Sequence, residues 1–266
     1  APEALAAQRE RDLKGLLTHI GRTVPYYRTL FADHGFDPDS ATEASLQRLP
    51  LLDKDTIRSR PEDFRAGDAP PMRRSNTGGS TGSPLVFWLT RERVSHDVAA
   101  KLRSFEWWDV TFGDREAVIW GAPHEVQAQD RLRTLRDRLF RSTLIPAFSM
   151  GDADIERYLR TLQHLRPRIV FGYPSAIALI ARRAQDTGID LEGLGVNVIF
   201  TTAEQLYPHQ RTLIEAVFGA RVANGYGARD AGFIAHECPA GGMHLTAEDI
   251  IVECVDDDGR PVPSGE

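Results

Sequence analysis

The sequence contains few cysteines, no long apolar run and no excess of positive charge. Its 266 residues include two cysteines, Cys238 and Cys254, which are too few for a disulfide framework. With 32 basic and 38 acidic residues, the formal net charge of −6 argues against a general nucleic-acid binder. No apolar segment approaches the roughly 18 to 20 residues that span a bilayer, and no signal-peptide pattern opens the chain. We therefore expect a cytoplasmic protein without nucleic-acid or membrane partners.

The most informative segment is rich in glycine and hydroxyl residues and reads Ser75-Asn-Thr-Gly-Gly-Ser-Thr-Gly-Ser-Pro84. Glycine lets backbone N–H groups approach an anion closely, and Ser and Thr hydroxyls add further donors. The segment lacks the Lys of a Walker loop. A flexible linker can have the same composition, but Pro84–Thr90 has the pattern of a buried strand directly after it. We interpret the segment as a polyphosphate-binding loop held by packed structure.

Helical and strand patterns alternate along the chain, which predicts an α/β fold. A helical stripe begins at Glu3 and ends near Gly21 and Pro25. Further helices are expected at Asp53–Arg60, Arg93–Trp108, Arg131–Phe140, Asp154–Leu165, Ser175–Thr187 and Pro208–Phe218. Strands are expected at Pro84–Thr90, Ala117–Trp120, Ile169–Phe171, Val196–Phe200, Arg221–Ala223 and Ile250–Val255.

The arginine-rich helix Arg131–Phe140 could bind a phosphate or an acidic partner. Its leucines fall on one helical face, which leaves most of the arginines on the other. A solvated basic face is the favoured interpretation.

Several segments together resemble the adenylate-forming superfamily. Thr77–Pro84 matches its loop signature, [ST]-S-G-[ST]-T-G-x-P. Segments that resemble the phenylacetate-CoA ligase-like branch follow in the family's order at Val24–Arg28, Leu49–Lys54, Phe171–Ser175, Thr202–Glu204, Asn224–Gly227, Glu237–Cys238, Gly242–His244 and Glu248–Asp249. These segments cover nearly the whole chain.

The resemblance implies the large N-terminal domain of such an enzyme, with mixed sheets flanked by helices. A helical leader is expected over residues 1–70, and the nucleotide- and acid-binding core over residues 71–266. The family's C-terminal lid domain, which carries a catalytic Lys, is absent from the sequence. We therefore expect these residues alone to be nearly inactive.

The resemblance also assigns three groups of binding residues. The β- and γ-phosphates of ATP would bind Thr77, Gly78, Gly79, Ser80, Thr81 and Gly82. The adenine side of ATP and AMP would contact Thr202, Ala203, Glu204, Asn224, Gly225, Tyr226 and Gly227. The acid would lie against Trp120, His124, Phe171, Tyr173, Pro174 and Ser175. Without the resemblance, Tyr226 would be interpreted as a core aromatic residue and His124 as a solvated loop histidine.

Two positions depart from the family pattern. Ser83 stands where many members have a Lys, and Arg229-Asp230 replaces the usual [ST]-Glu after the Tyr-Gly motif. As catalytic candidates, Asp230 would reach Mg²⁺ and Arg229 would bind a phosphate or a carboxylate through its forked guanidinium. The alternative is that both residues pair with their neighbours.

A second candidate site contains His236, Cys238 and His244, whose side chains are of the types that bind zinc. We interpret it as a structural Zn²⁺ site. A packed free cysteine with surface histidines is the more ordinary alternative.

The expected function is ATP-dependent activation of a small carboxylic acid, expected to be aromatic, to an acyl-adenylate, followed by thioester formation with coenzyme A. Transfer of the acyl group to an acyl-carrier protein or an amine is an alternative to thioester formation with coenzyme A. A protein of another functional class, a catalytically silent nucleotide- or acid-binding module, is the second alternative. The oligomeric state is open, a dimer included.

Overall fold

The computed structural model describes residues 2–77, 84–121 and 136–263. The chain divides into two compact units, one of Ala1–His96 with Thr246–Glu266 and one of Asp97–Leu245. The expected division at residue 70 stays a prediction. Within the described ranges, no helix combines the length and apolar character needed to cross a membrane.

The first unit begins with two helices, α1 (Pro2–Thr23) and α2 (Pro25–Asp33). The end of the first helix near Pro25 is confirmed, and a second helix starts there because proline fits a first helical position. Short helices follow at η1 (Pro38–Ser40), η2 (Glu43–Arg48), α3 (Lys54–Ser59) and η3 (Pro61–Phe64). A buried cluster of Leu13, Leu17, Phe31, Phe36 and Ala41, with Ile251 packed against it, holds this unit together.

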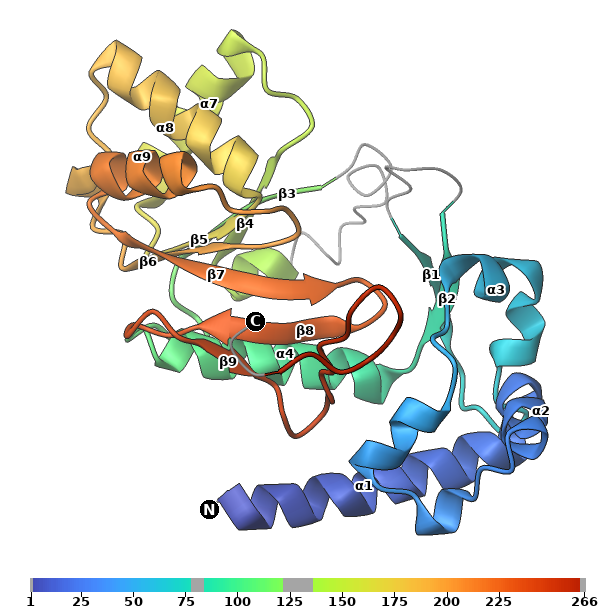
Figure 1. Ribbon diagram of the computed structural model, residues 1–266. Helices are drawn as coiled ribbons and strands as arrows, with labels where there is room; N and C mark the ends of the chain where they lie inside the picture. The colour runs from blue at the N-terminus through green and yellow to red at the C-terminus, as the bar shows by residue number, and fades with distance from the viewer. Residues whose placement is uncertain (1, 78–83, 122–135, 264–266) are drawn as a thin grey trace. The chain divides into compact units, whose positions relative to one another are not determined.

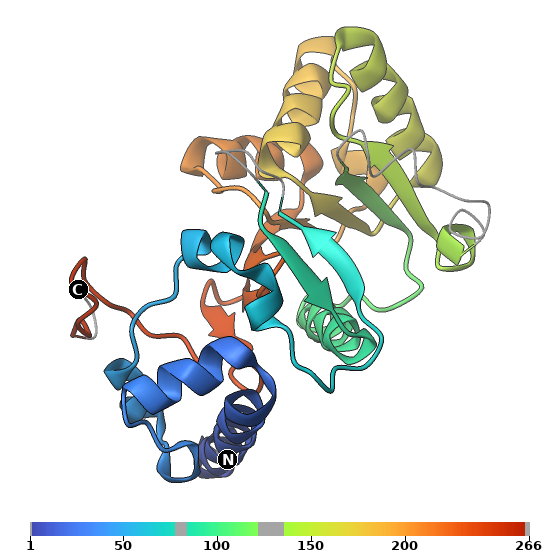
Figure 2. The same ribbon diagram turned by 90° about the vertical axis from the view of Figure 1, so that its right-hand side faces the viewer.

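An antiparallel hairpin of β1 (Arg73–Asn76) and β2 (Val86–Leu89) flanks the glycine-rich segment (Figure 2). The backbone N–H of Thr77 donates to the carbonyl oxygen of Leu85 at 3.0 Å. The Thr77 hydroxyl in turn accepts the Leu85 N–H at 3.0 Å. Both ends of the segment are therefore anchored, and the expected strand after it is confirmed. The polar strand β1 was not expected, because Arg-Arg-Ser-Asn shows no apolar alternation.

The second unit contains a seven-stranded sheet with strand order β4-β3-β5-β6-β7-β8-β9 (Figure 1). Its strands are β3 (Glu116–Trp120), β4 (Ser142–Pro146), β5 (Ile169–Gly172), β6 (Val198–Thr201), β7 (Arg221–Ala228), β8 (Gly232–Glu237) and β9 (Met243–Leu245). Pairing from β4 to β7 is parallel, and pairing from β7 to β9 is antiparallel. The carboxyl ends of the parallel strands therefore meet at one edge of the sheet.

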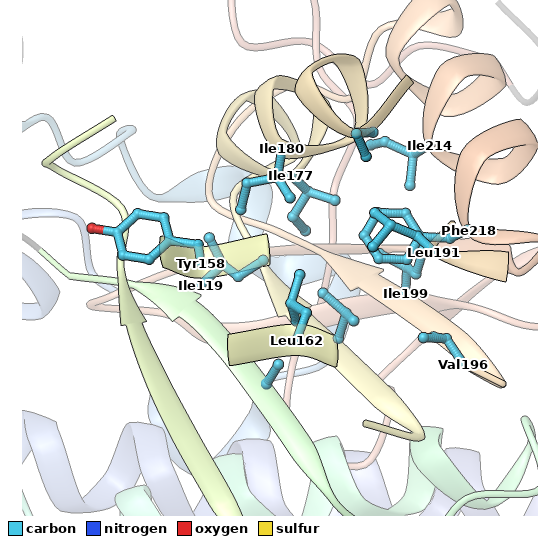
Figure 3. Packing of buried hydrophobic residues seen from close by; sticks show 14 of the residues in the cluster. Ile119, Tyr158, Leu162, Ile177, Ile180, Leu191, Val196, Ile199, Ile214 and Phe218 are labelled. Carbon is cyan, nitrogen blue, oxygen red and sulfur yellow. The ribbon is translucent and has the colours of Figure 1, made fainter. Parts of the chain in front are cut away.

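Helices α7 (Asp152–Leu165), α8 (Pro174–Thr187) and α9 (Pro208–Phe218) cover one face of this sheet (Figure 1). Figure 3 shows Ile177 and Ile180 of α8 beside Ile214 and Phe218 of α9 in the packed layer. The short helix η4 (Glu192–Leu194) precedes β6. On the opposite face, the end of α4 (Arg91–Glu106) packs through Phe105.

The expected α/β class, with a large mixed sheet flanked by helices, is confirmed. The strand expected at Ile250–Val255 is wrong: the backbone there forms only an isolated bridge between Val255 and Pro261. Val252 is 44% exposed, and no described strand pairs with this segment. The strand expected at Arg221–Ala223 extends to Ala228 as β7.

Candidate functional site

Neighbouring parallel strands end together at the carboxyl edge of the sheet. Gly172 ends β5, and its carbonyl oxygen accepts the backbone N–H of Thr202, which follows β6, at 3.2 Å. The carbonyl oxygen of Ile119 in β3 accepts the N–H of Tyr173 at 3.4 Å. In open α/β sheets, this edge is where ligands commonly bind.

Glu204 links two of the predicted binding segments. Its Oε2 accepts the backbone N–H of Ser175 at 3.3 Å, in the first turn of α8. A carboxylate is favourable there because the N-terminal end of a helix carries partial positive charge. Burial and the negative charge of Glu204 raise the pKa of Tyr173, while a hydrogen bond with the Gly121 backbone lowers it. The structure thus brings the Thr202–Glu204 turn to the start of the helix that carries Pro174 and Ser175.

Three aromatic rings form a wall at the ends of β3 and β5. The rings of Trp120 and Tyr173 are stacked, with 4.3 Å between centroids, and the rings of Trp120 and Phe171 lie 5.8 Å apart. Lys101 Nζ lies 4.1 Å from the Phe171 centroid and 2.7 Å from Glu116 Oε1. Each ring is partly exposed, so the wall can contact a flat apolar group.

The predicted adenine-side segments also lie together. Thr201 is the register partner of Asn224 across β6 and β7. A Cβ atom on Gly225 would lie 3.5 Å from the carbonyl oxygen of Thr201 and 3.6 Å from Thr202 Cβ, so the strand approaches the turn closely. Ala203 has a φ of 70°, a left-handed conformation that is uncommon for a residue other than glycine.

Tyr226 has 61% of its surface exposed, so the interpretation of this residue as a core aromatic is wrong. Its ring is available to a ligand. Arg229 and Asp230 lie in the exposed turn that joins β7 and β8. The β7–β8 register shifts between Tyr226 and Gly227, an irregularity that often re-aims side chains near a functional site.

The three zinc candidates lie at or beside the β8–β9 pair, where His236 is the register partner of His244. Only 4% of His236 is exposed, so it is not a surface histidine; burial, with Arg103 and Lys101 nearby, lowers its pKa to about 4. In the part of the chain that the structure describes, no three His, Cys, Asp or Glu side chains form a group able to hold a metal. Zinc binding at His236, Cys238 and His244 stays a prediction.

His124 and residues 78–82 of the loop fall outside the described residues. In the arginine-rich segment, Arg136 pairs with Asp137 at 2.6 Å, and the exposed Arg138 and Arg141 border a cavity of about 480 Å³ at the start of β4. This cavity lies at the opposite end of the parallel strands from the candidate site.

Sequence reasoning missed one ion pair beside the site. Arg211 of α9 donates to Glu237 of β8 at 2.7 Å, and the carboxylate also accepts the N–H of Asn224. Glu237 was noted only as a family-like position, and Arg211 was not noted. A buried carboxylate at the end of a strand is a signal for such a pair, but its partner is 26 positions away and follows no local pattern.

No protein-family model matches the chain. Protein CapK of Staphylococcus aureus is 23% identical over 237 residues, which cover 89% of this chain and 53% of that protein. A phenylacetate-coenzyme A ligase of Thermus thermophilus is 24% identical, over 99% of this chain and 60% of that protein. The chain thus spans between half and two thirds of the length of these relatives.

Among solved structures, a 2-hydroxyisobutyryl-CoA ligase in complex with 2-HIB-AMP and CoA superposes with a TM-score of 0.75. It is 22% identical, and the match covers 98% of this chain and 58% of that chain. This likeness shows the fold of an adenylate-forming ligase. Together, the sequence relatives and the fold confirm the resemblance of the chain to the phenylacetate-CoA ligase-like branch of the adenylate-forming superfamily.

Proposed function

We propose that the full-length protein activates a small carboxylic acid with ATP and transfers the acyl group to coenzyme A. The observation that carries this proposal is the meeting of the Trp120, Tyr173, Thr202 and Asn224 segments at the carboxyl edge of one sheet. Relatives named phenylacetate-coenzyme A ligase, and a structural neighbour that holds an acyl-adenylate and CoA, support the same reaction.

The reaction has two steps. A carboxylate oxygen of the acid attacks the α-phosphorus of ATP, and the bond to the leaving pyrophosphate breaks. The thiolate of coenzyme A then attacks the carbonyl carbon of the acyl-adenylate, and AMP leaves with the carboxylate oxygen. Catalysis of this kind depends on positioning and charge stabilisation.

Nucleotide binding is proposed for two parts of the chain. The backbone of residues 77–82 would hold the β- and γ-phosphates, because glycines allow close approach of N–H groups. The exposed ring of Tyr226 would stack on the adenine, beside the Thr202–Glu204 turn and Asn224.

The turn between β7 and β8 would bind the phosphates of ATP, directly or through Mg²⁺. Asp230 offers an exposed carboxylate oxygen, which suits Mg²⁺ because this ion commonly takes one or two carboxylates together with phosphate oxygens. Bound Mg²⁺ would neutralise phosphate charge. Arg229 would bind a phosphate or the carboxylate of the acid.

The acid would lie against the wall of Trp120, Phe171 and Tyr173. Stacked, partly exposed rings favour a flat or aromatic acyl group, and we propose an aromatic acid on this ground. A carrier protein or an amine would be an alternative acceptor, because the same adenylate can react with either nucleophile.

A catalytically silent nucleotide- or acid-binding module is the second candidate. It is favoured by Arg229-Asp230, which replaces the hydroxyl and the longer carboxylate of the family motif, and by Ser83. Such a module would bind ATP or an acid without chemistry.

Pyrophosphate exchange into ATP distinguishes the two candidates. The full-length protein is assayed with a panel of aryl and alkyl acids, beside calorimetry of ATP binding. Exchange that depends on an acid supports the enzyme, and the preferred acid identifies its class. Binding of ATP without exchange for any acid supports the module. Residues 1–266 alone are expected to exchange far more slowly than the full-length protein.

A further inference from the structure

Glu237 is buried where the sheet changes from parallel to antiparallel pairing. Strand β7 is parallel to β6 up to Asn224 and antiparallel to β8 from Gly225, whose partner is His236. Glu237 is the next residue of β8, and only 8% of it is exposed. A carboxylate so buried is costly unless charged and hydrogen-bonding partners surround it.

The Glu237 carboxylate has such partners from two elements. Its Oε2 accepts Arg211 Nη2 of α9 at 2.7 Å and the backbone N–H of Asn224 at 2.8 Å. A side-chain oxygen of β8 thus satisfies the amide of Asn224 just beyond the last regular pair of the β7–β8 ladder. The position of β7 at this point depends on that carboxylate.

Arg211 contacts the same strand a second time. Its Nη1 donates to the carbonyl oxygen of Val222 at 2.7 Å, so one guanidinium bridges β7 and Glu237. The backbone carbonyl of Glu237 in turn accepts Trp108 Nε1 at 3.1 Å. Both the backbone and the side chain of Glu237 are therefore fixed.

The residues held by this cluster lead directly into the proposed nucleotide site. Asn224 is followed by Gly225, which lies against Thr202, and by the exposed Tyr226. A small shift of β7 would move the Tyr226 ring relative to the Thr202–Glu204 turn. A misplacement of about 1 Å in a binding group can cost about a hundredfold in rate.

We propose that Glu237 and Arg211 are positioning residues that fix the Asn224–Gly227 segment for nucleotide binding. The inference rests on the proposed function, because it assumes that Tyr226 and its neighbours contact the adenine. In this role, neither side chain would touch the nucleotide. Their effect is exerted through the backbone of Val222 and Asn224.

The test compares Glu237→Gln with Glu116→Gln in the full-length protein. Glu116 is the matched control, because it forms a similar partly buried ion pair with Lys101 at 2.7 Å, at the other end of the parallel strands. Glu237→Gln should raise the KM for ATP about ten- to hundredfold with a smaller change in kcat. Glu116→Gln should leave the KM for ATP within about twofold of the wild type.

Arg211 supplies a second pair of variants if Glu237→Gln does not fold. Arg211→Lys keeps a cation for Glu237 but cannot reproduce both arms of the guanidinium, whereas Arg211→Met leaves the carboxylate without a charged partner. The KM for ATP should rise in the order wild type, Arg211→Lys, Arg211→Met. An equal KM for ATP in all three proteins would overturn the proposal.

Hydrogen exchange of the nucleotide-free protein gives a readout without turnover. Amides over residues 222–227 should exchange faster in Glu237→Gln than in the wild type, and Glu116→Gln should show no change there. Unchanged exchange over 222–227 in Glu237→Gln overturns the positioning role whether or not the wild type adenylates an acid. If the wild type shows no acid-dependent pyrophosphate exchange, that result would instead overturn the proposed function alone.

Discussion

The indole ring of Trp120 stacks on the phenol ring of Tyr173, with 4.3 Å between the centroids and 19° between the planes. Trp120 ends β3 and Tyr173 follows β5, so the backbone ladder of the two strands holds the rings together. Trp120→Ala should raise the KM for the preferred acid about tenfold or more, since it removes one wall of the proposed pocket. The KM for ATP should change much less.

Steady-state kinetics of the full-length protein measures both constants. Phe112→Ala is the control, because it removes a ring that is 59% exposed and precedes β3. An unchanged KM for the acid in Trp120→Ala would place the acid elsewhere.

Gly79→Val should abolish detectable ATP binding without unfolding the protein. A β-branched side chain restricts the backbone and blocks the close approach of N–H groups to phosphate. Gly15→Val is the control, because apart from its chain neighbours and the backbone of its own helix no described atom lies within 4 Å of the position that its Cβ would occupy. Calorimetry with ATP checks the result, and wild-type affinity in a folded Gly79→Val protein would contradict the phosphate-loop assignment.

Gly172→Ala should destabilise the sheet by about 3 kcal/mol, because its Cβ would overlap the backbone carbonyl of Ile119. A backbone atom in a paired strand cannot move aside as a side chain can. Gly225→Ala is the comparison, since the nearest atom to its Cβ is 3.5 Å away. Thermal unfolding should show a large drop for the first variant and a small one for the second; equal melting temperatures would argue against the tight β3–β5 packing.

The lowered pKa of the buried His236 should make the stability of the protein depend on pH. Burial, with the positive charges of Arg103 and Lys101, lowers its pKa from 6.5 to about 4, so the folded protein holds the ring neutral. The unfolded chain binds a proton at His236 below about pH 6.5, but the folded protein does so only below about pH 4. The free energy of unfolding should therefore fall by about 3 kcal/mol as the pH falls from 6.5 to 4. NMR titration of the chelator-washed protein should locate this pKa, and His236→Gln should remove that part of the loss. A ring that titrates near 6.5 would contradict the burial.

The fold class, the order of the motifs and most elements of the second unit could be predicted from the sequence. Strands β5 and β6 are short apolar runs between strongly periodic helices, so local pattern sufficed. Strands β8 and β9 escaped prediction, because the apolar run of β8 is limited to Phe-Ile-Ala and the Met-His-Leu of β9 is too short to show alternation. Their structure depends on pairing with β7.

The segments of the candidate site could be predicted from the sequence, but the contacts that hold these segments in place could not. Family-like spacing pointed to Thr202–Glu204 and Asn224–Gly227, and strand register explains why these segments meet. The Arg211–Glu237 pair could not be found in this way, because it joins a helix to a strand through tertiary packing alone. The Thr77–Leu85 bonds that anchor the loop are likewise visible only in three dimensions.

Transfer of ¹⁸O from a labelled carboxylic acid to AMP is a direct test of the proposed acyl-adenylate route. The full-length protein is incubated with ATP, coenzyme A and the acid found by pyrophosphate exchange, carrying ¹⁸O in its carboxylate, and the products are analysed by mass spectrometry. An acyl-adenylate route places one ¹⁸O atom in AMP, because the carboxylate oxygen attacks the α-phosphorus and leaves with it. Label in inorganic phosphate with release of ADP, or no labelled nucleotide at all, would contradict an adenylate-forming function.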